Sequence, residues 1–213
     1  NGAVKTMAGR RLGAIQLSKA ENAPASAEAI AEALVEGVRS YGLSVLPFPP
    51  SVTALRDRAA YAGLETLSDD ALLAGLDTWF PPLVVGKRRL SEISANALHD
   101  ALWALLGWEE QQLIQRLAPA HFSSPAGTTH AIDYAAPAGP TVELRVQALF
   151  GVADHPVIGT DRTPLILSLT SPAGRPIQTT RDLPGFWRGS WTDVAKEMRG
   201  RYPKHNWPDD PAG

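Results

Sequence analysis

The chain of 213 residues contains no cysteine. This absence excludes disulfide bonds, zinc sites built on thiolates and a thiol nucleophile. The sequence also lacks an uninterrupted run of the ~20 apolar residues that a membrane-spanning helix needs, and it has no signal-peptide core near its start. From these absences we predict a cytoplasmic protein that does not enter a membrane. Because the chain begins with Asn-Gly instead of Met, we expect it to be part of a longer polypeptide.

Motifs for nucleotide binding and hydrolysis are missing as well. There is no GxxxxGK[ST] loop to hold a triphosphate, no DExH acid for magnesium, no GxSxG elbow and no HExxH. The five histidines are scattered, and we interpret each as a hydrogen-bonded or solvated side chain instead of a metal ligand. The acidic pairs Asp69–Asp70 and Glu109–Glu110 suit helix starts, where they complement the helix dipole. The sequence therefore predicts no catalytic residue, metal or cofactor in this chain.

Charge is unevenly distributed, although the formal net charge is only -2. Residues 1–20 contain four cations and no acid: Lys5, Arg10, Arg11 and Lys19. The segment 175–204 contains seven cations and three acids, and aromatic residues lie among them. Cations attract phosphates and aromatic faces stack on bases, so this composition favours single-stranded nucleic acid as a partner. The residues predicted for this interface are Arg10, Arg11, Arg175, Arg181, Arg188, Arg199, Arg201, Lys204 and Trp187.

Each of these features has a plainer interpretation. Trp191 lies on a helical stripe and is assigned to the core, whereas Trp187 and Trp207 fit packing against a sheet better than base stacking. A run of surface charge is more often solvated or paired within the molecule than bound to nucleic acid. We predict that Arg199 and Arg201 face outward from the last helix, so their charges stay open to a partner.

Hydrophobic residues recur at helical spacing between residues 24 and 118. Ser26 precedes the stripe Ile30, Leu34, Val38 and Tyr41, and Gly42 follows it, which predicts a capped helix. Four further helices are predicted, from Ser51 to about Tyr61, from Ser68 to about Phe80, from about Ala95 to Leu106, and from Trp108 to Leu117. Residues 23–118 are therefore predicted to form an all-helical module.

The hydrophobic period changes after residue 118. Val142 and Leu144 alternate with Glu143 and Arg145, as expected for a strand with one buried face. Ser-Pro-Ala-Gly occurs at Ser124–Gly127 and Ser171–Gly174, with a near copy at Ala136–Gly139, and suits hairpin turns. A final helix is predicted to start at Ser190, with Asp193 completing a capping box.

These patterns predict an α+β fold. An all-helical module over residues 23–118 precedes a small antiparallel β-sheet module with a C-terminal helix over residues 119–213. Residues 1–22 are predicted to be a residual β segment.

The end of the sequence resembles a known family. The run RDLPGFWRGSW, followed by KEMRGRYPKH and WPDDP, is similar to the extreme C-terminus of the bacterial HrpB-type DExH-box ATP-dependent helicases. Segments at 11–17, 36–39, 43–47, 113–122 and 149–151 extend the resemblance over nearly the whole chain. It implies that two RecA-like domains, a winged helix and a helical ratchet-type module lie upstream of Asn1, where ATP and Mg²⁺ would bind. It also implies that residues 1–22 end an oligonucleotide-binding-like barrel. None of the family's catalytic motifs falls on a residue of this chain.

Two functions follow from the resemblance and the charge pattern. In the first, the chain is a non-catalytic C-terminal accessory region of a bacterial ATP-dependent RNA or nucleic-acid helicase. It then contacts the upstream helicase core in cis and single-stranded RNA or DNA through its basic surface. In the second, it is a protein-interaction or structural docking module without direct nucleic-acid contact. An independent hydrolase has no supporting constellation of residues.

Overall fold

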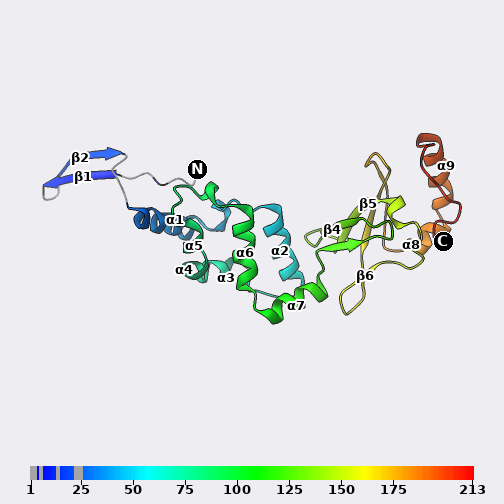
Figure 1. Cartoon of the computed structure of the whole chain (residues 1–213), viewed down its shortest axis with the longest axis horizontal. Coiled ribbons are helices and arrows are strands. Elements are labelled where there is room, and N and C mark those ends of the chain that lie inside the picture. The colour runs from blue at the N-terminus through cyan, green and yellow to red at the C-terminus, as the bar shows by residue number, and fades with distance from the viewer. Residues whose placement is uncertain (1–3, 5–6, 13–14, 22–25) are drawn as a thin grey trace. The chain divides into compact units, whose positions relative to one another are not determined.

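The computed structural model describes residue 4 and residues 26–213 with their side chains, and residues 7–12 and 15–21 by their backbone. It divides into two compact units, Asn1–Gln111 and Gln112–Gly213 (Figure 1). Helix α7 (Trp108–Leu117) contains the boundary between them. The three-part division of the chain into residues 1–22, 23–118 and 119–213 stays a prediction.

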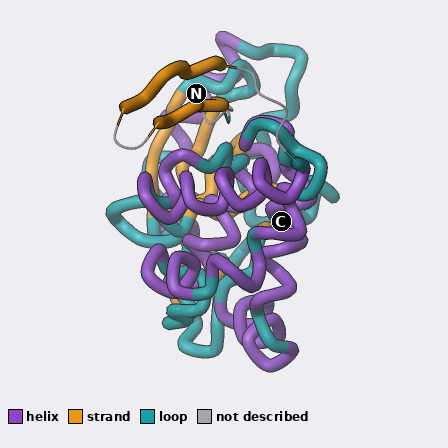
Figure 2. Tube along the Cα trace, turned by 90° about the vertical axis from the view of Figure 1, so that its left-hand side faces the viewer, coloured by secondary structure: helices purple, strands orange, loops and turns teal. Residues whose placement is uncertain are grey.

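In its described residues, the first unit consists of one β-hairpin followed by helices and 3-10 turns. Figure 2 shows the helices of the chain in purple and its strands in orange. Strands β1 (Met7–Leu12) and β2 (Ile15–Glu21) pair in antiparallel fashion. The helices that follow are α1 (Ala27–Tyr41), α2 (Pro50–Tyr61), α3 (Asp69–Ala74), α4 (Leu76–Trp79), α5 (Pro81–Val84) and α6 (Ala95–Leu105). The 3-10 turns η1 (Leu43–Val45) and η2 (Leu90–Glu92) connect α1 to α2 and α5 to α6.

Predicted caps explain where several of these helices begin. The Ser26 hydroxyl accepts a hydrogen bond from the Ala29 N–H at 3.1 Å, and the Ser68 hydroxyl accepts one from the Ala71 N–H at 3.2 Å. Each bond satisfies one of the backbone donors that a helix start leaves unpaired. Gly42, with φ of 79°, ends α1 in a conformation that costs other residues strain. These cap predictions are confirmed.

Three local predictions in the first unit are wrong. Ser51 does not cap α2, because the helix already begins at Pro50, whose fixed φ suits a first helical turn. Tyr41 is 77% exposed and lies outside the buried stripe of α1. The single helix predicted to run to Phe80 breaks at Gly75, so that α3 and α4 are separate.

The second unit contains a five-stranded sheet of order β3-β4-β5-β8-β9. Its strands are β3 (His121–Ser123), β4 (Thr129–Asp133), β5 (Thr141–Arg145), β8 (Ile166–Thr170) and β9 (Pro176–Thr180). The 3-10 turn η3 (Val146–Leu149) and the two-stranded β6 (Val157–Ile158) and β7 (Thr163–Pro164) lie in the connection between β5 and β8. Helices α8 (Leu183–Arg188) and α9 (Trp191–Arg201) end the fold.

The α+β class is confirmed, but the sheet is mixed instead of wholly antiparallel. Strands β5 and β8 run parallel, whereas the other neighbours in the sheet are antiparallel. A parallel pair needs a long crossover, and the segment from η3 to β7 provides it. Alternation within single strands carries no information about this pairing, so the sequence pattern could not distinguish the two directions.

The two Ser-Pro-Ala-Gly turns form the same hairpin, as predicted. The Gly127 N–H donates to the Ser124 carbonyl at 3.0 Å, and the Gly174 N–H donates to the Ser171 carbonyl at 2.9 Å. Both glycines have φ of 75°, the left-handed conformation that closes a three-residue hairpin loop. The first turn joins β3 to β4, and the second joins β8 to β9.

The core of the second unit lies between the sheet and the two C-terminal helices. Val142 and Leu144 of β5 and Leu167 and Leu169 of β8 are buried in one cluster with Trp191 of α9. Trp191 is only 1% exposed. Burial of large apolar side chains is the main stabilising contribution to such a fold. In the described residues, no helix is long and apolar enough to cross a membrane.

Candidate nucleic-acid interface

Helix α8 lies within the segment 175–204 from which the interface was predicted, and it was not predicted as a helix from the sequence. The Asp182 carboxylate accepts a hydrogen bond from the Gly185 N–H at 2.8 Å and so caps α8. A Cβ on Gly185 would lie 2.7 Å from the Asp182 Cγ and closer still to Oδ2. A side chain at position 185 would therefore displace the Asp182 carboxylate that caps the helix. The sequence pattern that indicates this helix is an aspartate at the N-cap position with a proline in the first helical turn.

Trp187, one of the predicted interface residues, lies in the core. It is 7% exposed, and its Nε1–H donates to the Val152 carbonyl at 2.9 Å. The ring lies at 5.2 Å from that of Trp191 and at 5.0 Å from that of Phe186, between centroids. A base could stack on this indole only after the core had opened. The burial favours the packing interpretation, and we leave Trp187 out of the proposed interface.

The other two tryptophans of the tail are buried in the same way. The Trp191 Nε1–H donates to the Pro208 carbonyl at 2.9 Å, and the Trp207 Nε1–H donates to the Tyr202 carbonyl at 3.0 Å. Trp207 is 4% exposed. Because each indole N–H has a carbonyl partner, the cluster can be buried without an unsatisfied donor. The aromatic residues of the tail therefore stabilise the unit.

Arg199 is exposed on the outward face of α9, as predicted, but its guanidinium already has partners within the chain. Its Nε–H and Nη2–H donate to the Trp207 carbonyl at 3.2 and 2.7 Å, and Nη2 also forms an ion pair with Asp209. The guanidinium thus holds the last residues of the chain against α9. Hydrogen bonds from a charged donor are stronger than neutral ones. Arg199 is therefore less available to a partner than the sequence alone indicates, because the chain returns after α9 and supplies two acceptors.

Two further predicted cations also have partners within the molecule. Arg181 donates from Nη2 to the Ala138 carbonyl and so connects the segment before α8 to the turn before β5. Arg201 forms an ion pair with Glu197, one helical turn earlier, at 3.2 Å. Such an exposed pair contributes little to stability, but it reduces the net positive charge that α9 presents.

All six predicted cations in the second unit are exposed, and three of them have neither an ion pair nor a side-chain hydrogen bond within the described residues. Arg175 follows the second Ser-Pro-Ala-Gly turn, where its backbone N–H donates to the Ser171 hydroxyl at 3.1 Å. Arg188 lies in the last turn of α8, and Lys204 follows α9. Arg10 and Arg11 lie on β1, whose side chains are outside the described part of the structure.

The sequence analysis missed a second basic segment, Lys87–Arg88–Arg89, between α5 and η2. Arg88 and Arg89 are exposed and Lys87 is partly so, and none of the three side chains has an ion pair in residues 26–213. The Arg88 N–H donates to Glu92 Oε2 at 3.0 Å, and the Arg88 carbonyl accepts from the Val4 N–H at 3.3 Å. The three consecutive cations are visible in the sequence. They were not predicted as a basic segment because acidic residues in the surrounding helices lower the net charge of this region.

The described residues offer no metal site, since no three of their His, Asp or Glu side chains are grouped to hold an ion. His155 has a structural position instead. Its Nδ1 accepts from the Leu183 N–H at 3.0 Å, so Nε2 carries the proton and donates to the Leu165 carbonyl at 2.7 Å. It thereby joins β8 to the start of α8.

Comparison with known proteins identifies the class of protein. Residues 79–211 match the family described as "ATP-dependent helicase C-terminal" (HrpB_C), and the chain belongs to this family. The chain is 38% identical over 218 residues to the ATP-dependent RNA helicase HrpB of Escherichia coli (strain K12), a match that covers 99% of this chain and 27% of that protein. The resemblance of the tail to HrpB-type helicases is thereby confirmed.

Solved structures give the same relationship. The crystal structure of the E. coli DExH-box NTPase HrpB matches with a TM-score of 0.77 and 35% identity, over 100% of this chain and 29% of that one. The crystal structure of the E. coli DEAH/RHA helicase HrpB matches with a TM-score of 0.68 and 32% identity, over 97% and 29% of the two chains. The present chain therefore spans less than a third of the length of these relatives.

Proposed function

We propose that this chain is a non-catalytic accessory region of a bacterial ATP-dependent helicase and that it helps the helicase hold a single strand. The cations that carry this proposal are Arg88, Arg89, Arg175, Arg188 and Lys204, which are exposed and have no ion pair in the described residues, together with the partly exposed Lys87. Arg10 and Arg11 add to this set by their sequence. Each phosphate that such a cation contacts releases condensed counterions, which favours binding.

Catalysis belongs, in this proposal, to the upstream helicase core that acts in cis in the cytoplasm. We place ATP and Mg²⁺ in that core, because scattered lysines cannot replace a row of backbone amides around a triphosphate. Residues 1–213 alone are expected to show no ATP hydrolysis. Activity above buffer in a preparation free of contaminating ATPases contradicts this expectation.

The test of strand binding is a titration of the isolated chain with labelled single-stranded RNA at several salt concentrations. RNA is the first probe because the E. coli relative is named an RNA helicase, and single-stranded DNA of the same length is the second. Six phosphate contacts at about -0.7 each predict a slope of about -4 for log affinity against log salt. If neither strand binds at low salt, the proposal is wrong.

A pair of variants shows whether the missed basic segment takes part. Arg88→Ala with Arg89→Ala removes two contacts, so the slope should become shallower by about 1.4. Arg39→Ala is the matched control, because this arginine is already paired with Asp77 at 2.6 Å and with Glu36 at 3.2 Å. The control should leave the slope unchanged. An equal effect of both changes would indicate a general charge effect instead of local contacts.

Docking on the helicase core is the second candidate function. Arg181, Arg199 and Arg201 have intramolecular partners, which leaves fewer open charges than the sequence suggested. If charge reversal at Arg175 and Arg188 leaves RNA affinity unchanged but lowers the ATPase rate of the complete helicase, these residues contact the core.

A further inference from the structure

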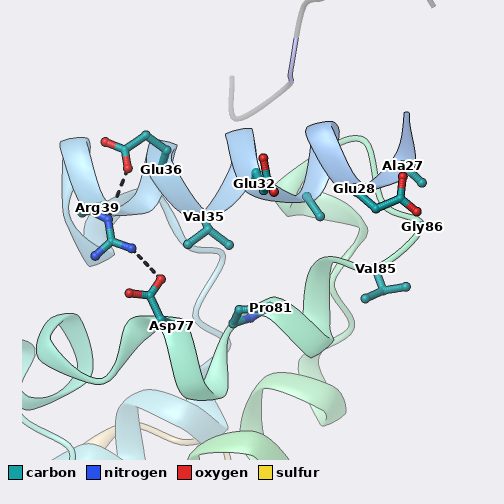
Figure 3. A pocket seen from close by; sticks show the side chains of 11 residues that line it. Ala27, Glu28, Glu32, Val35, Glu36, Arg39, Asp77, Pro81, Val85 and Gly86 are labelled. Atoms are coloured by element: carbon teal, nitrogen blue, oxygen red, sulfur yellow. Dashed lines mark hydrogen bonds and ion pairs between the residues drawn. The ribbon is translucent and has the colours of Figure 1, made fainter. Parts of the chain in front are cut away.

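The first unit contains a groove of about 550 Å³ between α1 and the segment from α4 to Gly86 (Figure 3). Small and apolar residues line it, with Ala27, Ala31 and Val35 on α1 and Pro81 and Val85 on the opposite side. Val85 is 71% exposed, which is unusual for a side chain of this kind. The two alanines project little from α1, so another backbone can approach the helix closely.

One edge of the groove is acidic. Glu28, Glu32 and Glu36 recur at intervals of four residues on α1 and therefore follow one edge, about 6 Å apart at each step. Hydrogen bonds to its own backbone N–H and to the Ser26 side chain lower the pKa of Glu28, so this group is ionised at neutral pH. Among the described residues, Glu28 and Glu32 have no ion pair.

The other end of the acidic edge is already paired with an arginine. Arg39 pairs with Glu36 at 3.2 Å and with Asp77 at 2.6 Å, as the dashed lines of Figure 3 show. The Asp77 carboxylate also raises the pKa of Arg39 further above its usual range. The open part of the groove therefore combines an apolar floor with two carboxylates that have no ion pair in residues 26–213. This combination repels phosphates, so the groove is not a continuation of the strand-binding surface.

The occupant that fits these features is an amphipathic helix with cations four residues apart. Helices pack side by side when the side chains of one fill the grooves of the other, and small residues shorten the distance between them. Cations at positions i and i+4 of such a helix repeat at the same spacing as Glu28 and Glu32. Its apolar stripe would cover Val85 and Val35.

We propose that this groove is the docking site for a basic amphipathic helix from the part of the helicase polypeptide outside residues 1–213. The chain spans only 27% of its E. coli relative, so most of such a polypeptide is available to supply the helix. A segment of the same polypeptide is also present at a high effective concentration, which a separate protein would not have. This contact holds the accessory region on the core and does not depend on strand binding.

The direct test places a photo-crosslinking phenylalanine at Val85 in the complete helicase polypeptide. Irradiation should give an intramolecular crosslink to a segment outside residues 1–213 that has at least two cations four residues apart, identified by mass spectrometry. The same amino acid at Trp108, which is 74% exposed but lies outside the groove, is the control and should not label that segment. A crosslink to a second copy, to a segment without cations or only to residues 1–25 overturns the proposal, and so does no crosslink.

Two matched pairs of variants test the chemistry of the contact. Glu32→Lys should lower the yield of the crosslink at least about fivefold, because like charges then face each other. Glu143→Lys, a reversal of another exposed acid, should not. Ala31→Trp, which fills the groove, should lower the yield, whereas Ala33→Trp on the exposed part of α1 should leave it unchanged. Equal yields within either pair contradict the proposed helix.

The RNA titration keeps this proposal separate from the proposed function. Glu32→Lys should leave the salt dependence of RNA binding by the isolated chain intact, with circular dichroism confirming an unchanged fold. If the crosslink does not form but RNA binding persists, only the proposal of the docking helix is wrong. A crosslink with no RNA binding overturns the strand-binding role alone.

Discussion

The two units of this chain use their charged residues in different ways. In the second unit, Arg181, Arg199 and Arg201 bind acceptors within the molecule, and the tryptophans among them are buried. In the first unit, Lys87–Arg89 and two acids of the groove on α1, Glu28 and Glu32, lack ion pairs in residues 26–213. Most of the arginine and tryptophan side chains of the tail therefore pack or find partners within the second unit. The less conspicuous helical unit presents two open surfaces of opposite charge.

The difference shows that composition alone does not distinguish a binding surface from a folded core. Arginine and tryptophan serve both purposes, because each combines an apolar surface with hydrogen-bond donors. The two cases differ in whether the hydrogen-bond donors of these side chains already have partners. That depends on which distant segments of the chain fold back against them. The following variants test that distinction.

The largest effect is expected at Trp187. Trp187→Ala should destabilise the second unit by about 3–5 kcal/mol, because it leaves a cavity among aromatic rings. Trp187→Phe should lose the hydrogen bond to Val152 but keep most of the packing, and it should bind RNA with unchanged affinity. Urea unfolding followed by near-ultraviolet circular dichroism gives the stability, and fluorescence anisotropy gives the affinity. A folded Trp187→Phe protein with much weaker RNA binding would show that this side chain also contacts bases.

Two glycines in neighbouring helices should respond in opposite directions. Gly185→Ala places a Cβ against the Asp182 carboxylate and breaks the cap of α8, at a cost of about 2 kcal/mol. Gly200→Ala in α9 meets no atom within 4 Å, and alanine should stabilise the helix by about 0.5–1 kcal/mol. Unfolding midpoints of the two variants compare the effects directly. A neutral Gly185→Ala would mean that Asp182 is not the effective cap.

The two arginines of α9 should differ despite their proximity in the sequence. Arg199→Ala removes both hydrogen bonds to the Trp207 carbonyl and should cost about 1–2 kcal/mol. Arg201→Ala removes only an exposed pair with Glu197 and should cost less than about 0.5 kcal/mol. Tryptophan fluorescence during urea unfolding measures both. Equal losses would indicate that the tail from Trp207 onward is not held by Arg199.

The smallest effect concerns the helix starts of the first unit. Ser26→Ala removes the hydrogen bond that caps α1 and should destabilise this unit by about 0.5–1 kcal/mol. Ser51→Ala should change stability by about zero, because this serine lies inside α2 and α2 has no side-chain cap bond. Far-ultraviolet circular dichroism during thermal unfolding follows both variants. If Ser51→Ala lowers the stability more than Ser26→Ala does, Ser51 caps α2 as the sequence predicted.

The sequence by itself determined part of the local structure of this protein. Ser26 and Ser68 accept hydrogen bonds from N–H groups three residues later. Each of the two Ser-Pro-Ala-Gly turns is closed by a hydrogen bond from its glycine N–H to its serine carbonyl. These interactions span a few residues, so residue type and spacing are sufficient to predict them. The same holds for the alternation of β5, and for the resemblance of the tail to the HrpB-type helicases, which is a property of residue order.

Only the tertiary structure decided which charged and aromatic groups remain open. Ser190 fails as a cap because its hydroxyl donates to Gln178, a residue of β9 that the sequence does not place beside α9. Arg199 is occupied because Trp207 and Asp209 return to it, and β5 pairs with β8 in parallel because a long crossover intervenes. Each outcome depends on a partner distant in the chain, and a donor that is satisfied by such a partner is lost to any ligand.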